Sequence, residues 1–339
     1  MAKPPPPFLI KWAQYLGARC AAGLLCTADI DAAFHGASFW GRVGVKLSRK
    51  RRERVMTNLT TAYPNASRQW CEKICTASFE HFARLIVEVT QFPHLLNTDS
   101  WSKHLTFHHN SETIRWLNKG NPALLVTGHI GNWEVLGFGS ALMGYPIEAL
   151  ARPIDNPLIN DWLMGIRERR GLKILTKWNA TDRMIQVLNS GGSLGLVADQ
   201  NAGDKGLFVP FFNRLASTYK SIALLAINQE VPIICTSAQR VGNQFKYQIG
   251  TTDIIKPEDW VDQPDPLFYV TARYMRALET MVRACPDQYL WMHRRWKSRP
   301  RFERLGKPMP SAMIAKIEQL PWMTPTLLEE LKKPFADGA

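Results

Sequence analysis

A histidine and a glutamate, His129 and Glu134, are separated by four residues in the segment GHIGNWE at residues 128–134. The segment follows a short apolar run that is typical of a buried strand, and it leads into a predicted helix. Glu134 would lie in the first helical turn, where its carboxylate can fold back toward the imidazole. A carboxylate bound to one ring nitrogen stabilises the imidazolium that forms when the other nitrogen takes a proton. The pair therefore predicts general-base chemistry.

The same segment contains residues that would shape a substrate site. Asn132 is a good helix N-cap, and Gly128 and Gly131 allow a substrate to approach the backbone closely. Amides at the start of the helix could hold an oxyanion. A plainer interpretation stays open, in which His129 only hydrogen-bonds within the turn and Glu134 only complements the helix dipole.

The elements that must position these residues alternate regularly between strand and helix. Buried strands are predicted at residues 123–127, 147–151, 172–175, 194–198 and 232–238, and helices at 132–143, 159–170, 181–189 and 218–228. Such alternation predicts an α/β fold with a mainly parallel central sheet flanked by helices. An antiparallel neighbour is expected at 245–249, and a long helix that Asp265 caps at 265–284. Ligands gather at the carboxyl ends of such strands, where Arg152, Asp199 and Gln200 also stand.

The N-terminal third predicts helices and contact with a membrane surface. One helix is expected at residues 69–90, closed by Pro93. The apolar stretch at 15–45 contains too many charged residues to span a bilayer, but it could lie in the membrane interface. Four of the six residues from Arg49 to Arg54 are arginines, and one more is a lysine. Such a run favours an anionic surface, although a solvated helix face is an equal alternative.

The overall charge is strongly basic, with a formal net charge of +13 at pH 7. This charge favours anionic partners such as nucleic acid, anionic lipid or an acidic carrier protein. The twelve tryptophans beside the cations favour a membrane interface, and we find no nucleic-acid-binding motif. The six cysteines include no C-x-x-C pair, so we expect reduced thiols in the cytosol. No secretory signal peptide is apparent.

Several ordered blocks together carry a resemblance to a known family. The segment at 128–134 resembles the His-(four residues)-acid signature of glycerolipid acyltransferases, in the Glu form of the lipid A late acyltransferases. Blocks at 151–157, 167–171, 199–218, 231–232 and 292–300 are similar to that family in the same order, and the resemblance covers about residues 42–300. Two departures from the family's sequence pattern bear on the identity of the acceptor more than on the type of reaction. Asn213 replaces a usual glycine, and Tyr219-Lys220 replaces a small, proline-bearing stretch.

The resemblance implies transfer of a fatty acyl chain from acyl carrier protein, or from acyl-CoA, to a hydroxyl of a glycolipid such as a lipid A precursor. His129 would be the general base and Glu134 its orienter, without metal, cofactor or covalent enzyme intermediate. The expected location is the cytoplasmic face of the inner membrane, reached peripherally or through an N-terminal anchor. Other acceptors stay open, such as a phosphatidylinositol mannoside or an aminolipid, as do a thioester hydrolase and a non-catalytic binder of membrane or nucleic acid.

Further residues receive roles from the same resemblance. Arg152 would bind a phosphate or headgroup, unless it pairs with Asp155 or Glu148. At least one of the arginines at 167, 169 and 170 would face the acceptor. Asp199 and Gln200 would contact the substrate, although Asp199 could instead position an arginine or cap the following turn. Asn132 is counted with the substrate-binding residues, and Phe208, Phe211 and Phe212 would line an acyl channel or belong to the core. We expect an N-terminal helical region at 1–100, a catalytic α/β domain at 101–305 and an appendage at 306–339.

Overall fold

The central element is a seven-stranded sheet in the order β1-β9-β8-β2-β5-β3-β4. The computed structural model describes residues 7–168, 171–176 and 180–333. The strands are β1 (Leu105–His108), β2 (Leu124–Thr127), β3 (Ile147–Leu150), β4 (Lys173–Leu175), β5 (Ser193–Val197), β8 (Ile233–Arg240) and β9 (Tyr247–Ile255). The pairs β8–β2, β2–β5, β5–β3 and β3–β4 are parallel, whereas β9 runs antiparallel to β8. The predicted mainly parallel α/β fold is confirmed, including the antiparallel neighbour.

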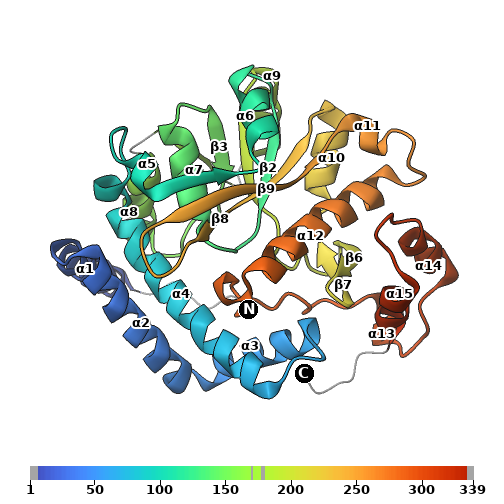
Figure 1. Ribbon diagram of the computed structural model, residues 1–339, viewed down its shortest axis with the longest axis horizontal. Coiled ribbons are helices and arrows are strands. Elements are labelled where there is room, and N and C mark those ends of the chain that lie inside the picture. The colour runs from blue at the N-terminus through green and yellow to red at the C-terminus, as the bar shows by residue number, and fades with distance from the viewer. Residues whose placement is uncertain (1–6, 169–170, 177–179, 334–339) are drawn as a thin grey trace.

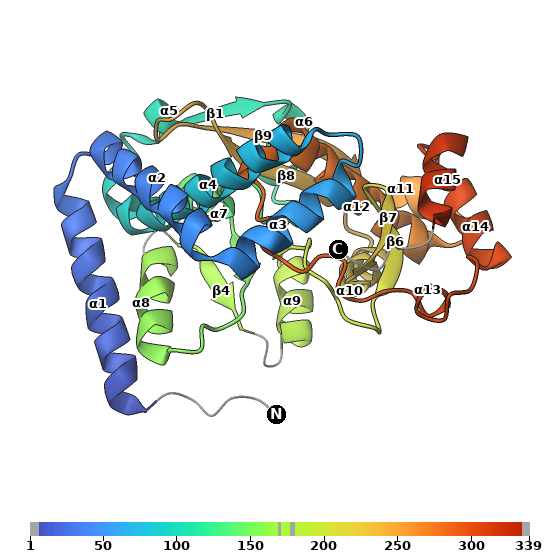
Figure 2. The same cartoon turned by 90° about the horizontal axis from the view of Figure 1, so that it is seen from below.

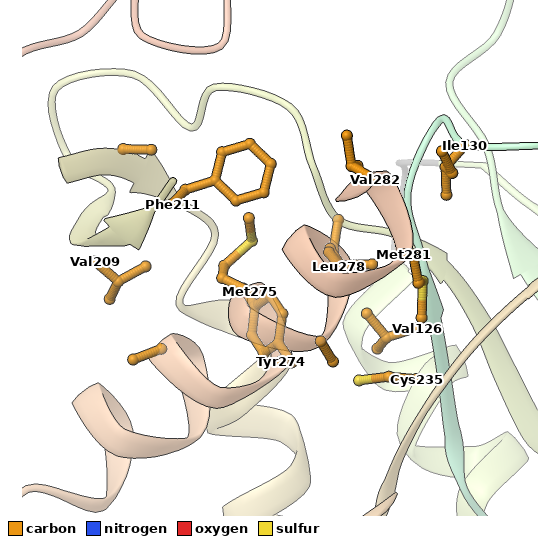
Figure 3. Packing of buried hydrophobic residues seen from close by; sticks show 14 of the residues in the cluster. Val126, Ile130, Val209, Phe211, Cys235, Tyr274, Met275, Leu278, Met281 and Val282 are labelled. Atoms are coloured by element: carbon orange, nitrogen blue, oxygen red, sulfur yellow. The ribbon is translucent and has the colours of Figure 1, made fainter. Parts of the chain in front are cut away.

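The central strand β2 is buried on both faces, as its continuous apolar sequence predicts. Successive residues point to opposite faces, so Leu124 and Val126 join one hydrophobic cluster and Leu125 joins another. The first cluster contains the long helix α12 (Pro266–Ala284), and Figure 3 shows Val126 of β2 near its Met281 and Leu278. Burial on both sides fixes the direction and register of β2, and therefore the place where its carboxyl end emerges.

Helices connect the strands and flank the sheet (Figure 1). Those between the parallel strands are α7 (Trp133–Leu142), α8 (Pro157–Glu168), α9 (Ala180–Asn189) and α10 (Ser221–Gln229). Short helices α5 (Trp101–His104), α6 (Ser111–Asn118) and α11 (Pro257–Trp260) lie beside β1, β2 and β9 in the chain. Asp265 caps α12 through the amide of Phe268, as its sequence predicts.

Four helices precede the sheet: α1 (Phe8–Thr27), α2 (Ile30–Leu47), α3 (Arg49–Ala62) and α4 (Arg68–Leu95). Figure 2 shows α1 along one edge of the molecule, next to α8, while α2 and α4 pack together. The helix α4 extends to Leu95, so the prediction that Pro93 ends it is wrong. Among the described residues, no helix is long and apolar enough to cross a bilayer.

The remaining chain forms a hairpin and several short helices. The antiparallel strands β6 (Leu207–Phe211) and β7 (Arg214–Thr218) form a separate two-stranded sheet that the sequence did not predict. After α12 come a 3-10 turn at Pro286–Gln288 and the helices α13 (Arg301–Arg304), α14 (Ser311–Glu318) and α15 (Pro325–Lys332). Ile317 and Leu328 belong to the same hydrophobic cluster as α12, so the C-terminal helices pack on the main core. Phe211 and Phe212 are also buried in this cluster, which supports the core interpretation over an acyl channel.

Candidate active site

The candidate active site lies where the central parallel strands β2 and β5 end. Thr127 of β2 is in register with Val197 of β5. Two residues beyond this pair on each strand stand His129 and Asp199, so the register of the sheet brings them together. The chain continues from β2 to β3, which lies on one side of the pair β2–β5, whereas the next strand of this sheet after β5 is β8, which lies on the other side. Such a switch point is where open α/β sheets bind ligands.

His129 is held by both oxygens of the Asp199 carboxylate. Its ring nitrogen Nδ1 lies 2.7 Å from Oδ1, and its backbone amide donates to Oδ2 over 3.0 Å. The Asp199 side chain is only 2% exposed, whereas that of His129 is 16% exposed. Burial alone would raise the pKa of Asp199, but the charge and hydrogen bonds of His129 outweigh it and lower that pKa far below its usual range. The carboxylate is therefore ionised at neutral pH.

This pairing determines which ring nitrogen can act as a base. An ionised carboxylate only accepts, so Nδ1 must carry the proton that it donates, and the lone pair of the neutral ring lies on Nε2. Burial alone would lower the pKa of His129, but Asp199 outweighs it through charge and hydrogen bond, with a smaller contribution from Glu134, and raises that pKa. The arrangement is an imidazole base with a stabilised protonated form.

Three side chains surround the imidazole. The amide nitrogen of Gln200 lies 3.4 Å from Nε2 of His129. The Trp133 ring packs edge-on with its centroid 4.8 Å from the imidazole, and the His293 ring lies tilted at the same 4.8 Å. Burial, followed by the charge of His129, lowers the pKa of His293, which favours its neutral form. A hydroxyl that approaches Nε2 would therefore meet Gln200 and neutral rings.

The loop that carries His129 is fixed by backbone hydrogen bonds to two other segments. The carbonyl of His129 accepts from Leu290, and the amide of Gly131 donates to the carbonyl of Gln288, each over 3.0 Å. The amide of Asn132 donates to the carbonyl of Ala238 in β8 over 2.8 Å. These amides serve the protein itself, so the expectation that the helix start offers free amides for an oxyanion does not hold at Gly131 or Asn132.

Two further features of this loop explain its sequence. Ile130 is completely buried and belongs to the same hydrophobic cluster as α12 (Figure 3). Gly131 has a φ of 57°, and a Cβ there would lie 2.1 Å from the carbonyl oxygen of Ala238. Only glycine fits this position. The loop therefore leaves His129 partly exposed while it buries the residue that follows.

Glu134 has a different partner from the expected one. Its two oxygens accept from Nε and Nη2 of Arg167 in α8, the Nε contact measuring 2.8 Å. Asp199 is the carboxylate hydrogen-bonded to the imidazole, which corrects the expected orientation by Glu134. The physical reason is competition, since a guanidinium matches a carboxylate in a bidentate geometry and the strand register already provides His129 with an acid. Arg167, one of the three arginines of which at least one was expected to face the acceptor, forms this ion pair instead.

Other predicted site residues are dispersed. Asn132 is completely buried, and its side-chain oxygen accepts from the backbone amide of Val135. Its side-chain nitrogen donates to Glu88. Asn132 is therefore not accessible for the expected contact with substrate. Its predicted N-cap role is confirmed. Arg152 lies exposed after β3, while Glu148 pairs with Arg183. Arg169 and Arg170 lie outside the described residues.

One buried arginine that the sequence pattern did not single out contacts the segment that carries Gln200. Arg295 is 1% exposed, and its guanidinium donates to the carbonyl of Ser217 over 2.6 Å and to the hydroxyl of Thr218 over 2.8 Å. It also donates to the carbonyl of Gln200 over 3.4 Å. Arg295 thus ties Gln200 to β7. The cation-rich closing block was the available signal, but nothing in it distinguished the buried arginine from Arg294, which is exposed.

The fold and site define a class of protein: an α/β protein with an imidazole paired to a buried carboxylate at the carboxyl edge of its sheet. In the described residues, no cluster of three or more His, Cys, Asp or Glu side chains is arranged to hold a metal ion. A family model described as bacterial lipid A biosynthesis acyltransferase matches residues 7–298. The chain belongs to this family and is an acyltransferase of the lipid A biosynthesis type.

Individual relatives agree with the family. The chain is 26% identical over 265 residues to the lipid A biosynthesis lauroyltransferase of Escherichia coli K12, covering 77% of this chain and 83% of that protein. It is 26% identical over 297 residues to a lipid A biosynthesis acyltransferase of Haemophilus influenzae, covering 85% and 91% of the two chains. The lipid A biosynthesis palmitoleoyltransferase of Escherichia coli K12 is 26% identical over 261 residues, covering 74% and 80%.

Proposed function

We propose that this protein transfers a fatty acyl chain from the thioester of acyl carrier protein, or from acyl-CoA, to a hydroxyl of a lipid A precursor, with His129 as general base. The observation that carries the proposal is the hydrogen bond between Nδ1 of His129 and the buried carboxylate of Asp199, which leaves Nε2 as the basic nitrogen at a partly exposed position. Family membership supports acyl transfer, and the acceptor hydroxyl is the group that needs such a base.

The proposed reaction needs two proton transfers at Nε2. The acceptor hydroxyl gives its proton to Nε2 while its oxygen attacks the thioester carbonyl carbon, forming the C–O bond. Collapse of the tetrahedral intermediate breaks the C–S bond, and the imidazolium returns the proton to the departing sulfur. Asp199 stabilises the imidazolium between these steps, so we propose it as the residue that orients His129. The products are an ester and a free thiol.

Gln200 and Glu134 receive supporting roles in this proposal. The Gln200 amide lies on the Nε2 side of the ring, so the acceptor hydroxyl would replace it as the partner of Nε2. Glu134 raises the pKa of His129 through its charge and connects α7 to α8 through Arg167. Arg152, which is exposed, stays a proposed contact for phosphates of donor or acceptor, as does Arg170, which lies outside the described residues.

The N-terminal helices are proposed to place the enzyme on the membrane that contains its acceptor. Apolar side chains of α1 and α2 lie exposed, among them Trp40, which is 67% exposed, together with Phe8, Leu9, Trp12, Leu16, Leu24, Phe39 and Leu47. Lysines and arginines accompany them, and aromatic residues mixed with cations favour an anionic interface. We propose peripheral association with the cytoplasmic face of the inner membrane, with no role for nucleic acid.

The experiment that tests this function compares donors and acceptors with purified protein. Lauroyl-carrier protein and lauroyl-CoA are each incubated with a lipid A precursor, a phosphatidylinositol mannoside, an aminolipid or no acceptor, and products are identified by mass spectrometry. The proposal expects an added acyl ester on the lipid A precursor. An ester on another lipid alone would reassign the acceptor, and free fatty acid without any ester would make the protein a thioester hydrolase.

A further inference from the structure

A buried charged network connects the N-terminal helix α4 to the loop that carries His129. Its negative charge is Glu88 of α4, which is completely buried. Its positive charge is Arg240 at the end of β8, whose side chain is 3% exposed. Arg240 donates to one oxygen of Glu88 through Nε over 2.8 Å and through Nη2 over 2.6 Å. Charges buried this deeply are costly and persist only where partners satisfy them.

The other polar atoms of the network reach the catalytic loop. The second oxygen of Glu88 accepts from the side-chain amide of Asn132 over 2.5 Å. The remaining nitrogen of Arg240, Nη1, lies 2.7 Å from Nδ1 of His81, and Nε2 of His81 lies 3.0 Å from the carbonyl oxygen of Gly131. Gly131 and Asn132 are the residues that connect the His129 turn to α7.

The protonation of His81 follows from these contacts. A guanidinium only donates, so Nδ1 of His81 must be the acceptor and Nε2 must carry the proton given to Gly131. Burial, together with the charge of Arg240, lowers the pKa of His81 well below its usual value and keeps the ring neutral. A single arrangement of protons therefore satisfies the whole chain from Glu88 through Arg240 and His81 to Gly131.

We propose that Glu88, Arg240 and His81, together with Asn132, are positioning residues that hold the catalytic loop in the geometry needed for proton transfer. The proposal rests on the proposed function, in which His129 is the base. None of the four residues is exposed enough to touch a substrate, because their relative exposures are between 0% and 6%. They act through Gly131 and the N-cap of α7. A buried charged network with its end atoms on Gly131 and Asn132 thus holds the loop that carries His129, through contacts separate from those of Asp199.

Substitutions that remove one contact at a time test this role. Asn132→Ser keeps an N-cap oxygen for Val135 but loses the donor to Glu88, and His81→Phe removes the donor to Gly131. We expect kcat to fall about 10- to 100-fold in each, since small misplacements of a catalytic group have effects of that size, with KM little changed. His81→Gln restores a donor toward Gly131 and should recover much of the lost kcat.

Glu279→Gln provides a matched control for lost stability. Glu279 is also a buried carboxylate with two arginine partners, Arg276 and Arg283, but it holds the amide of Phe212 instead of the catalytic loop. Its substitution should lower the melting temperature and leave kcat near that of the wild type. If Glu279→Gln loses kcat as strongly as Asn132→Ser at a matched loss of melting temperature, the network is only structural and the inference is overturned.

The same assay separates this inference from the proposed function. His129→Ala is measured beside the network variants, with lauroyl-carrier protein and a lipid A precursor as substrates. An inactive His129→Ala together with wild-type kcat in Asn132→Ser and His81→Phe would overturn the inference alone. A His129→Ala protein as active as the wild type would overturn the proposed function instead.

Discussion

Replacing Asp199 by asparagine should deprive Nε2 of His129 of its basic lone pair, although the side chain at position 199 keeps nearly the same shape. The two carboxylate oxygens have different partners, Nδ1 of His129 at 2.7 Å and the backbone amide of His129 at 3.0 Å. The backbone N–H can only donate, so the asparagine oxygen must face it and the asparagine NH₂ must face Nδ1. Nδ1 then becomes an acceptor, and the ring proton moves to Nε2. The lone pair that should receive the hydroxyl proton is lost.

The magnitude follows from that change of tautomer. General-base catalysis contributes about 10² to 10⁴ in rate, and an enforced wrong tautomer forfeits most of it, so kcat of Asp199→Asn should fall by about 10² to 10⁴. Each tenfold loss corresponds to about 1.4 kcal/mol of transition-state stabilisation. Initial rates of ester formation from lauroyl-carrier protein and a lipid A precursor, measured by mass spectrometry, provide the assay, with circular dichroism as the control for folding.

The pH dependence gives the same prediction a second readout. His129 must be neutral to accept a proton, so wild-type kcat/KM should rise with pH through the raised pKa of this histidine. Without the carboxylate, burial should dominate and lower that pKa, so the residual activity of Asp199→Asn should reach its plateau at a lower pH. An Asp199→Asn enzyme within about threefold of wild-type kcat, with an unmoved profile, would refute the assignment of Asp199.

Three other perturbations have defined outcomes. Glu134→Gln should shift the rise of kcat/KM to lower pH and reduce kcat less than Asp199→Asn does, because it removes a charge near His129 but no hydrogen bond to the ring. A loss of kcat larger than that of Asp199→Asn would restore Glu134 as the residue that orients His129. Gly131→Ala should unfold at a clearly lower temperature in a thermal melt, since its Cβ would lie 2.1 Å from the carbonyl oxygen of Ala238; an unchanged melt would contradict this loop geometry. The double variant Phe39→Ser with Trp40→Ser should keep its melting temperature and lose about tenfold or more in binding to anionic vesicles, and equal binding would exclude α2 from the membrane contact.

The strands and helices of the sheet were predictable because burial on both faces leaves continuous apolar runs. The run before Gly128 predicts β2, and a polar cap such as Asp265 or Thr324 marks where a helix begins. The hairpin of β6 and β7 lacked such signals. Its turn places Phe212 at a φ of 55°, a conformation usually given to glycine or asparagine, and the buried Glu279 stabilises it through the amide of Phe212.

The position of His129 was predictable, but the identity of its acid was not. Local reasoning selects the nearest carboxylate in the sequence, which is Glu134. The observed partner, Asp199, depends on β5 lying between β2 and β3, and no local pattern reveals this strand order. The same limit applies to Asn132, which was counted with the substrate-binding residues but is buried against Glu88 of α4, a contact between segments far apart in the sequence.

The role of His129 as general base is tested by the single-turnover rate of acyl transfer in the wild type and in His129→Ala. Each folded protein is mixed in excess with labelled lauroyl-carrier protein and a lipid A precursor, and the ester formed is followed over time. We expect a loss of at least about 10²-fold in His129→Ala, because the substitution removes the basic nitrogen Nε2 that is proposed to take the hydroxyl proton. A variant that transfers the acyl chain within about threefold of the wild-type rate would contradict this role.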